Sequence, residues 1–196
     1  MLENKKIALI TFATGKYISL VPKLYATASK HFLPGKNITF VLFTDNVSRA
    51  KNLAESYQIK AFKIKHEPWP YITLKRYHTI SQLEGYLRDN FEYLYYIDAD
   101  MAFHDAVNEE IIGNLVATKH PGFYDKPRKK FIYETRKEST AYIAPEEGEY
   151  YFIGAFQGGK TDIYLKAVNE MKKNIDKDIE NGIIALWHDE SHWNRY

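Results

Sequence analysis

The stretch Tyr93-Leu94-Tyr95-Tyr96-Ile97-Asp98-Ala99-Asp100-Met101 joins a short apolar run to two carboxylates one residue apart. The run has the length and composition of a buried β-strand. Ligand sites in α/β proteins gather at the carboxyl ends of such strands, so Asp98 and Asp100 are expected at the rim of a sheet. There they can hold a hard divalent cation, and the cation can hold a diphosphate.

A second triplet with the same spacing, Asp176-Lys177-Asp178, lies in the charged stretch of residues 172–180. No apolar run precedes it, and its carboxylates are expected on a solvent-exposed helix face. The preceding strand, rather than the spacing, therefore distinguishes Asp98 and Asp100.

The first hundred residues alternate between apolar runs and helical patterns. Apolar runs occupy residues 7–12, 38–45 and 59–64, with helical spacing between them. This alternation predicts βαβ crossovers and a mostly parallel, Rossmann-like sheet of the α/β class. The loop at residues 13–16 contains a single glycine, so it matches neither a dinucleotide fingerprint nor a Walker motif.

Composition excludes several classes of protein. With 196 residues the chain is expected to form one domain, and its net charge of +2 gives no support for a nucleic-acid partner, although residues 126–130 with Arg136 form one local basic loop. The absence of cysteine excludes disulfides, cysteine-ligated zinc and a thiol nucleophile. No apolar run approaches the ~20 residues of a membrane span, and residues 1–6 lack a signal-peptide core, so a soluble, cytoplasmic protein is expected.

The pattern changes after about residue 105. Residues 106–196 predict a smaller, aromatic, loop-rich region, with strands at 115–118, 141–143 and 150–157 and a helix at 161–177. Before it, a helix is expected from Leu74 to about Asn90 with Thr73 as its N-cap. Lys75 and Arg76 would lie in its first turn, where the helix dipole disfavours cations, so they either face an anion or carboxylate or form an exposed pair.

The densest cluster of reactive side chains consists of His188, Asp189, Glu190 and His192. Two histidines at i and i+4 can bind zinc on a helix, but the metalloprotease pattern requires Glu directly after the first histidine, where Asp189 stands. Beside the Trp187 indole, Glu190 is instead a candidate nucleophile or cation-stabilising group. Asp98 and Asp100 would then bind Mn²⁺ or Mg²⁺ and neutralise a departing diphosphate, while Glu190 faces the charge that grows on a sugar carbon.

Three long motifs in the second half resemble the signature blocks of glycosyltransferase family 6. The motifs are His120-Pro121-Gly122-Phe123-Tyr124, Tyr150-Tyr151-Phe152-Ile153-Gly154-Ala155-Phe156-Gln157-Gly158-Gly159 and Trp187-His188-Asp189-Glu190-Ser191-His192-Trp193-Asn194-Arg195-Tyr196. The resemblance runs from about Ile7 to the last residue. It implies a GT-A fold and a retaining transfer of galactose, or N-acetylgalactosamine, from its UDP-sugar, usually in α-1,3 linkage to a galactoside acceptor.

The resemblance also implies roles for individual residues. Uridine would be held by Phe12, Thr14 and Tyr17, and ribose and metal by Asp98 and Asp100. Arg76 would contact the donor sugar and the aspartate pair, and Asp189 would bind donor hydroxyls. The substituent at C2 of the sugar would be sensed by Ile153, Gly154 and Ala155, where Ala at position 155 favours galactose and Gly favours N-acetylgalactosamine. His120 and Trp187 would shape the acceptor site, and Glu190 would be the nucleophile or cation stabiliser.

Two departures from the family pattern bear on activity. Many bacterial relatives carry Asn at both aspartate positions and work without metal, so Asp98 and Asp100 resemble the metal-dependent animal branch. Relatives also continue beyond the position of Tyr196 with a segment that supplies basic residues over the diphosphate. Weaker transfer and more prominent donor hydrolysis are therefore expected.

Two other classes of protein remain as alternatives. An apolar strand ending in Asp-x-Asp also describes haloacid-dehalogenase-like phosphatases, with Asp98 as nucleophile, but Phe103 and His104 follow it here and the motif comes late in the chain. A non-catalytic carbohydrate-binding module would explain the aromatic content, including 16 tyrosines. Such a module has no need of paired metal carboxylates and a distant Glu190.

Overall fold

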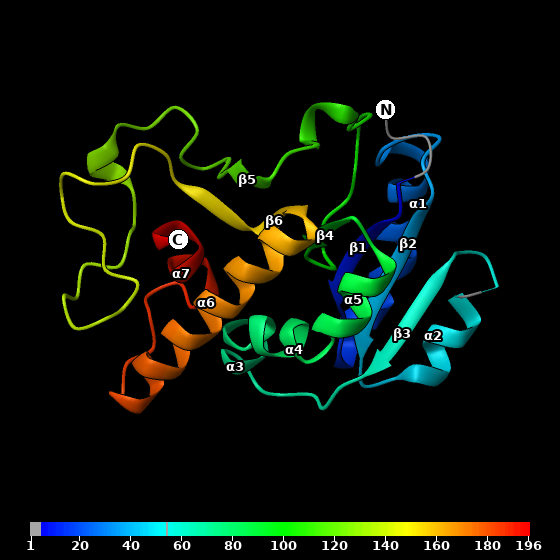
Figure 1. Cartoon of the computed structure of the whole chain (residues 1–196), viewed down its shortest axis with the longest axis horizontal. Coiled ribbons are helices and arrows are strands. Elements are labelled where there is room, and N and C mark those ends of the chain that lie inside the picture. The colour runs from blue at the N-terminus through cyan, green and yellow to red at the C-terminus, as the bar shows by residue number, and fades with distance from the viewer. Residues whose placement is uncertain (1–4, 54) are drawn as a thin grey trace. The chain divides into compact units, whose positions relative to one another are not determined.

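The computed structural model, which describes residues 5–53 and 55–196, contains a six-stranded mixed sheet (Figure 1). Residues 1–4 lie outside the described residues, and they make up most of the segment that was expected to lack a signal-peptide core. The strand order is β3-β2-β1-β4-β6-β5, with β1 parallel to β2 and β4, and β2 parallel to β3, whereas β6 runs antiparallel to β4. The strands are β1 (Ile7–Phe12), β2 (Ile38–Thr44), β3 (Ile59–Lys63), β4 (Tyr93–Ile97), β5 (Leu115–Lys119) and β6 (Phe152–Lys160).

Helices occupy most of the connections between strands. The α-helices are α1 (Val21–His31), α2 (Val47–Leu53), α3 (Tyr71–Leu74), α4 (Arg76–Gln82), α5 (Glu84–Asn90), α6 (Thr161–Glu180) and α7 (Asp189–Arg195), and the short 3-10 helices are η1 (Gly15–Ser19), η2 (Glu109–Ile111) and η3 (Arg128–Lys130). The α/β class and the mostly parallel sheet are confirmed. Among the described residues, every helix is too short or too polar to cross a bilayer.

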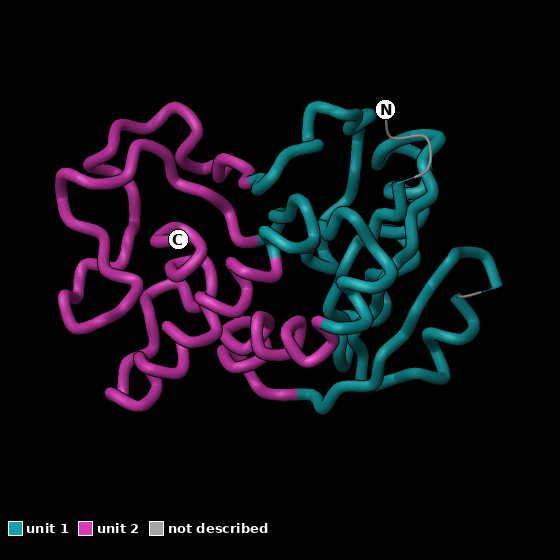
Figure 2. The backbone as a smooth tube through the Cα atoms, in the orientation of Figure 1, with its two compact units in different colours: residues 1–66, 85–116, 155–164 teal, residues 67–84, 117–154, 165–196 magenta. Residues whose placement is uncertain are grey.

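The chain divides into two compact units, and neither is continuous in sequence (Figure 2). Unit 1 comprises residues 1–66, 85–116 and 155–164, and unit 2 comprises residues 67–84, 117–154 and 165–196. The strand β6 supplies residues to both units. The expectation that residues 1–105 bind the nucleotide and residues 106–196 the sugar and acceptor stays a prediction.

The core of unit 1 surrounds the central strands. All five residues of β4 are buried, as are the first five of β1, which explains why both read as continuous apolar runs rather than as alternating ones. Tyr25 of α1 stacks on Phe40 of β2 with ring centroids 4.0 Å apart. Unit 2 has an aromatic core of its own, centred on Tyr133, Ile143 and Tyr151.

Two elements differ from the sequence-based expectation. The helix expected from Leu74 to Asn90 is three short helices, interrupted at Lys75 and Leu83. Thr73 is not an N-cap, because it lies inside α3, whose N-cap is Pro70, and its hydroxyl donates to the Pro70 carbonyl. The strand expected at residues 141–143 is reduced to an isolated bridge between Glu134 and Tyr142.

The position of Asp178 overturns another expectation. Asp178 is 1% exposed rather than solvated, and its carboxylate accepts hydrogen bonds from the Ser139 hydroxyl at 2.5 Å and the Thr140 backbone N–H at 2.7 Å. Asp176, two residues earlier, is half exposed and pairs with His78. Only the Asp176 side of α6 is therefore the solvated face that the charge pattern indicated.

Candidate active site

The carboxyl ends of β1 and β4 bring Phe12 and Asp98 together in unit 1. The Tyr96 hydroxyl donates a short hydrogen bond to Oδ1 of Asp98, and the Tyr96 ring lies 6.0 Å from the ring of Phe12. Phe12 in turn stacks on Phe43 at 4.6 Å. The predicted uridine-binding and metal-binding residues thus share one edge of the sheet, as expected for parallel strands.

The loop after β1 presents the other two predicted uridine-binding residues. Thr14 is buried, with its Oγ1 atom 2.9 Å from Nδ1 of His66, whereas Tyr17 is 46% exposed. Between them Gly15 adopts a left-handed backbone conformation (φ 55°), which glycine allows at little cost, and its N–H donates to the Asp45 carboxylate at 3.1 Å. Tyr17 is therefore accessible to a ligand, while Thr14 and Gly15 hold the loop in place.

Asp98 and Asp100 lie in one tight turn directly after β4, which the N–H of Met101 closes by donating to the Asp98 carbonyl at 3.2 Å. Asp98 is partly buried and Asp100 is exposed. Among the described residues there is no group of three or more His, Asp or Glu side chains that could enclose a metal ion. Two carboxylates fit a hard divalent cation that takes its remaining ligands from water and substrate phosphates.

Glu190 has two hydrogen-bond donors in unit 2. The Tyr151 hydroxyl donates to Oε1 at 2.8 Å, and the Gly154 backbone N–H donates to Oε2 at 2.8 Å. Burial raises the pKa of Tyr151, and the Glu190 carboxylate raises it further, so Tyr151 stays protonated and remains a donor. The expected position of the Trp187 indole beside this carboxylate stays a prediction, and these two polar donors are partners that the sequence did not indicate.

Gly154 permits the close approach of Glu190. A Cβ atom added at Gly154 would lie 3.2 Å from Cβ of Glu190. The neighbouring Ala155, 8% exposed, belongs to unit 1, where its carbonyl accepts the N–H of Asp98 at 3.0 Å. Ile153, on the other side, is partly buried. The three residues expected to sense the donor sugar therefore include one whose carbonyl anchors the aspartate turn.

Arg76 faces a carboxylate, which resolves the two alternatives left open by the sequence. Its Nε atom lies 2.9 Å from Oδ2 of Asp189, and its Nη1 atom donates to the Gly154 carbonyl at 3.1 Å. Lys75, by contrast, is 41% exposed with its ammonium 3.8 Å from the Glu67 carboxylate. The favourable pairing of a buried guanidinium explains why a cation is tolerated at the start of α4.

The predicted acceptor residues His120 and Trp187 also lie in unit 2. The backbone N–H of His120 donates to the Tyr151 carbonyl at 2.8 Å, and the two rings lie 5.7 Å apart. Trp187 is 45% exposed. The ring of His188 lies edge-on to Trp69, 4.9 Å away, and Trp69 is 73% exposed. Exposed indoles of this kind can pack on the face of a sugar ring.

The two histidines of the cluster have different surroundings, which argues against the zinc alternative. His188 precedes α7 and packs on Trp69, whereas His192 lies within the helix, 2% exposed, with Nε2 3.7 Å from Oδ2 of Asp178. They therefore do not form an i, i+4 pair on one helix face.

Sequence reasoning missed Tyr96, His66 and Tyr151. A signal existed for Tyr96, because residues i and i+2 of a strand point to the same side, so Tyr96 can reach Asp98. His66 and Tyr151 carry no local signal, since each meets its partner across more than 35 residues of sequence.

Comparison with known proteins identifies the family. The family model described as "Glycosyltransferase family 6" matches residues 1–196. Histo-blood group ABO system transferase 2 of Rattus norvegicus is 35% identical over 199 residues, covering 100% of this chain and 60% of its own length. Globoside alpha-1,3-N-acetylgalactosaminyltransferase 1 is 35% identical in Gallus gallus and 34% identical in Homo sapiens, each match covering 98% of this chain and 57% of the relative.

The chain thus spans somewhat more than half the length of these relatives. Its α/β architecture, with a mostly parallel six-stranded sheet, agrees with the GT-A fold that the motifs implied. The match to the family covers both units, including the turn with Asp98 and Asp100 and the helix that carries Glu190. The chain belongs to glycosyltransferase family 6.

Proposed function

We propose that this chain is a metal-dependent, retaining glycosyltransferase that moves galactose from UDP-galactose to a glycan acceptor, in α-1,3 linkage to a galactoside. UDP-N-acetylgalactosamine is the second candidate donor and UDP-glucose the third. The observation that carries the proposal is the Glu190 carboxylate, oriented by two donors, Tyr151 and the Gly154 N–H, at 2.8 Å each. A carboxylate held in this way is suited to meet positive charge on a sugar carbon.

Unit 1 would bind the nucleotide. Phe12 and Tyr17 offer aromatic faces to uracil, and Thr14 lies between them in the same loop. Asp98 and Asp100 would hold Mn²⁺ or Mg²⁺ together with the diphosphate, because a magnesium-like ion is commonly bound through one or two carboxylates and substrate phosphates. The bound ion would neutralise negative charge on the leaving diphosphate.

Unit 2 would supply the group that meets the sugar. In a two-step course an oxygen of Glu190 attacks the anomeric carbon, and the bond from that carbon to the UDP oxygen breaks with its electron pair leaving on UDP. The acceptor hydroxyl then displaces Glu190 and gives its proton to a phosphate oxygen of UDP. In the one-step alternative Glu190 only stabilises the cationic sugar while the acceptor enters on the face that UDP leaves; both courses retain the anomeric configuration.

Asp189 and Arg76 would bind the donor sugar from the same unit, with His120 and Trp187 beside the acceptor. The 2.9 Å pairing of Arg76 with Asp189 fixes the direction in which each side chain can offer its remaining polar atoms. Contact of Arg76 with the aspartate pair stays a prediction. When water replaces the acceptor, the same course yields free sugar and UDP.

The choice of donor depends on Ala155. The resemblance associates Ala at this position with galactose and Gly with N-acetylgalactosamine, which places galactose first. Two of the relatives carry α-1,3-N-acetylgalactosaminyl transfer in their names, which keeps that sugar as the second candidate and supports the α-1,3 linkage.

The test is an assay of UDP release. The chain is incubated with UDP-galactose, UDP-N-acetylgalactosamine or UDP-glucose, with Mn²⁺, Mg²⁺ or EDTA, and with or without a galactoside such as lactose. We expect metal-dependent release of UDP, fastest with UDP-galactose, and a new galactosyl-galactoside when the acceptor is present. Binding of galactosides without release of UDP would favour a carbohydrate-binding module, and phosphate release from simple phosphate esters would favour a phosphatase using Asp98.

A further inference from the structure

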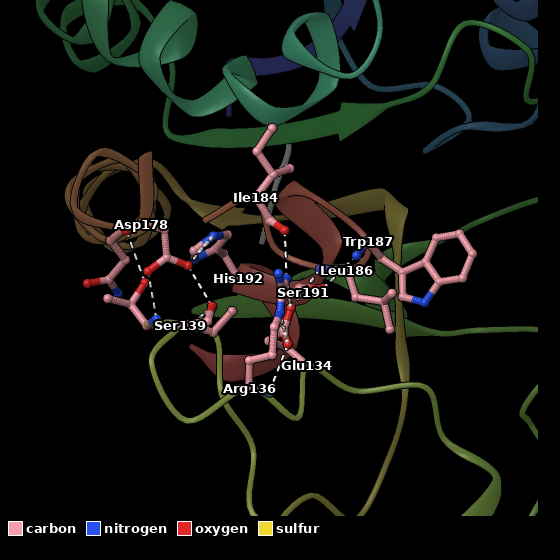
Figure 3. Close-up of polar contacts among 12 residues, drawn as sticks. Glu134, Arg136, Ser139, Asp178, Ile184, Leu186, Trp187, Ser191 and His192 are labelled. Atoms are coloured by element: carbon pink, nitrogen blue, oxygen red, sulfur yellow. Dashed lines mark hydrogen bonds and ion pairs between the residues drawn. The ribbon is translucent and has the colours of Figure 1, made fainter. Parts of the chain in front are cut away.

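Glu134 and Arg136 form hydrogen bonds with two backbone positions of the segment between α6 and α7 (Figure 3). The Arg136 Nη2 atom donates to the Ile184 carbonyl at 2.6 Å, and the Leu186 N–H donates to Oε2 of Glu134 at 2.8 Å. Ala185, between these two hydrogen-bonded residues, is 1% exposed. The backbone of residues 184–186 is therefore fixed from one side by a single ion pair.

The pair is itself closely bonded. Arg136 donates from its backbone N–H and its Nε to Oε1 of Glu134, both at 2.9 Å, and from Nη2 to Oε2 at 2.6 Å. Glu134 is 2% exposed; burial acts to raise its pKa, but the hydrogen bonds from Arg136 and Leu186 outweigh burial and lower the pKa to about 2. A buried, ionised carboxylate depends on all of its donors, and the Leu186 N–H is one of them.

The loop that carries the pair is anchored to α6. Asp178 receives the hydrogen bonds from Ser139 and Thr140, and the Thr140 hydroxyl donates to the Asn174 carbonyl at 3.0 Å. Asp178 is thus the buried carboxylate that ties residues 139–140 to the helix (Figure 3). Glu134 and Arg136 consequently lie in a segment that is hydrogen-bonded to α6 through residues 139–140.

Residues 184–186 lead to Glu190 through a strained turn at Trp187 and His188. His188 has φ 52° and ψ −123°, a positive-φ conformation that is unfavourable for a non-glycine residue and persists only where surrounding contacts enforce it. Its N–H donates to the Ala185 carbonyl at 2.9 Å, and the Trp187 N–H donates to the Ser191 hydroxyl at 2.9 Å. In Figure 3 the Trp187 indole points away from these polar contacts.

We propose that Glu134 and Arg136 are positioning residues for Glu190: by holding residues 184–186 they keep the turn at Trp187 and His188 closed and the start of α7 in register with Tyr151 and Gly154. The inference rests on the proposed function, because it concerns the same carboxylate. A displacement of about 1 Å at a reacting group can cost about a hundredfold in rate. Weakening the hydrogen bonds that Glu134 and Arg136 form with residues 184–186 should therefore slow turnover without weakening nucleotide binding.

The variant Arg136→Lys tests the proposal. Lysine keeps the positive charge, but its ammonium lacks the planar fork that serves the carboxylate and the Ile184 carbonyl together. We expect kcat for UDP release, counted per UDP-binding site, to fall about tenfold or more, with the Kd for UDP within about twofold of wild type. The backbone amides of Leu186 and His188 should exchange hydrogen faster. Glu134→Gln, of nearly equal size, should act in the same direction.

A matched control is Arg88→Lys, because Arg88 pairs with Asp162 on an exposed surface of unit 1. This variant should leave kcat and the exchange of the Leu186 amide unchanged. If Arg136→Lys accelerates exchange at Leu186 but kcat per site equals that of wild type, the positioning role is refuted. The role is equally refuted if exchange is unchanged, or if kcat falls only in proportion to the loss of UDP-binding sites.

Failure of the proposed function has a different signature. A wild-type chain that releases no UDP from any UDP-sugar refutes the transferase, and the positioning role with it. Normal wild-type turnover together with an unaltered Arg136→Lys variant refutes the positioning role alone.

Discussion

The guanidinium of Arg76 and the carboxylate of Asp189 lie 2.9 Å apart, and each side chain is only 5% exposed. Two residues separated by 113 positions therefore form a buried ion pair at the start of the helix that carries Glu190. Burying an ion pair costs the desolvation of both charges. Removing one partner is nevertheless strongly destabilising, because it leaves the other charge buried and uncompensated.

Replacement of Arg76 by Ala should lower the free energy of unfolding by about 3–5 kcal/mol, because the Asp189 carboxylate would stay buried without that guanidinium. Chemical denaturation measures the change. Arg195→Ala is the control, since Arg195 and Glu147 are 45% and 49% exposed, and it should cost less than about 1 kcal/mol. Equal, small losses in both variants would show that the buried pair adds no more than a surface one.

Replacement of Asp100 by Asn should abolish the response to Mn²⁺, because the turn then offers one carboxylate instead of two. The readout is UDP affinity by calorimetry with and without Mn²⁺, alongside the rate of UDP release. Asp105→Asn, which changes another exposed carboxylate farther along the same loop, should retain the full metal response. A wild-type chain whose turnover ignores EDTA would contradict the metal assignment.

Replacement of Ala155 by Gly should shift donor preference from UDP-galactose toward UDP-N-acetylgalactosamine, because removal of a methyl group makes room for the larger substituent at C2. A donor competition assay measures the ratio of the two kcat/KM values. Ala8→Gly, in the buried strand β1, controls for the loss of about 0.5–1 kcal/mol that glycine causes in a strand and should leave the ratio unchanged. An unchanged ratio in Ala155→Gly would discard this role.

The stability of the fold should depend on pH through His192. Burial lowers the pKa of His192 below its usual 6.5, against the smaller opposing effect of the Asp178 and Glu134 carboxylates. Between the folded pKa and 6.5 the unfolded chain binds a proton that the folded chain excludes, so the free energy of unfolding falls as the pH drops below about 6.5. His192 alone can contribute up to about 1.4 kcal/mol per pH unit.

The check is the slope of unfolding free energy between pH 7 and pH 5. His192→Gln removes the titrating group and should flatten the slope, whereas His104→Gln, at an exposed position, should not. Parallel curves for wild type and His192→Gln would rule out a neutral, buried His192.

The sequence predicted the parts of this molecule that depend on local pattern. The continuous apolar runs of β1, β2 and β4 indicated buried parallel strands, and the position of Asp98 after such a run placed it at the sheet edge. Arg76, Asp189 and Glu190 were singled out by the local charge pattern, and the motif resemblance added their proposed roles at the donor sugar, but neither source gives contacts. Their pairing and burial became visible only in the structure.

The errors have a common physical cause. Asp178 was expected in solvent because its neighbours in sequence are charged, but Ser139 and Thr140, nearly forty residues away, desolvate and bond it. The donors to the Glu190 carboxylate, the Tyr151 hydroxyl and the Gly154 N–H, were missed because both are more than 35 residues from Glu190 in sequence. In each case a tertiary contact, which no local pattern encodes, decided the surroundings of the charge.

The most direct measurement is proton NMR of UDP-galactose with Mn²⁺ and either the wild-type chain or Glu190→Gln, with Glu147→Gln as the matched control for loss of an exposed carboxylate. We predict that wild type and Glu147→Gln release UDP and first form the α-anomer of galactose or of a galactoside. Glu190→Gln should bind UDP normally but turn over about a hundredfold more slowly. A β-anomer as first product, or unchanged turnover in Glu190→Gln, would contradict the account.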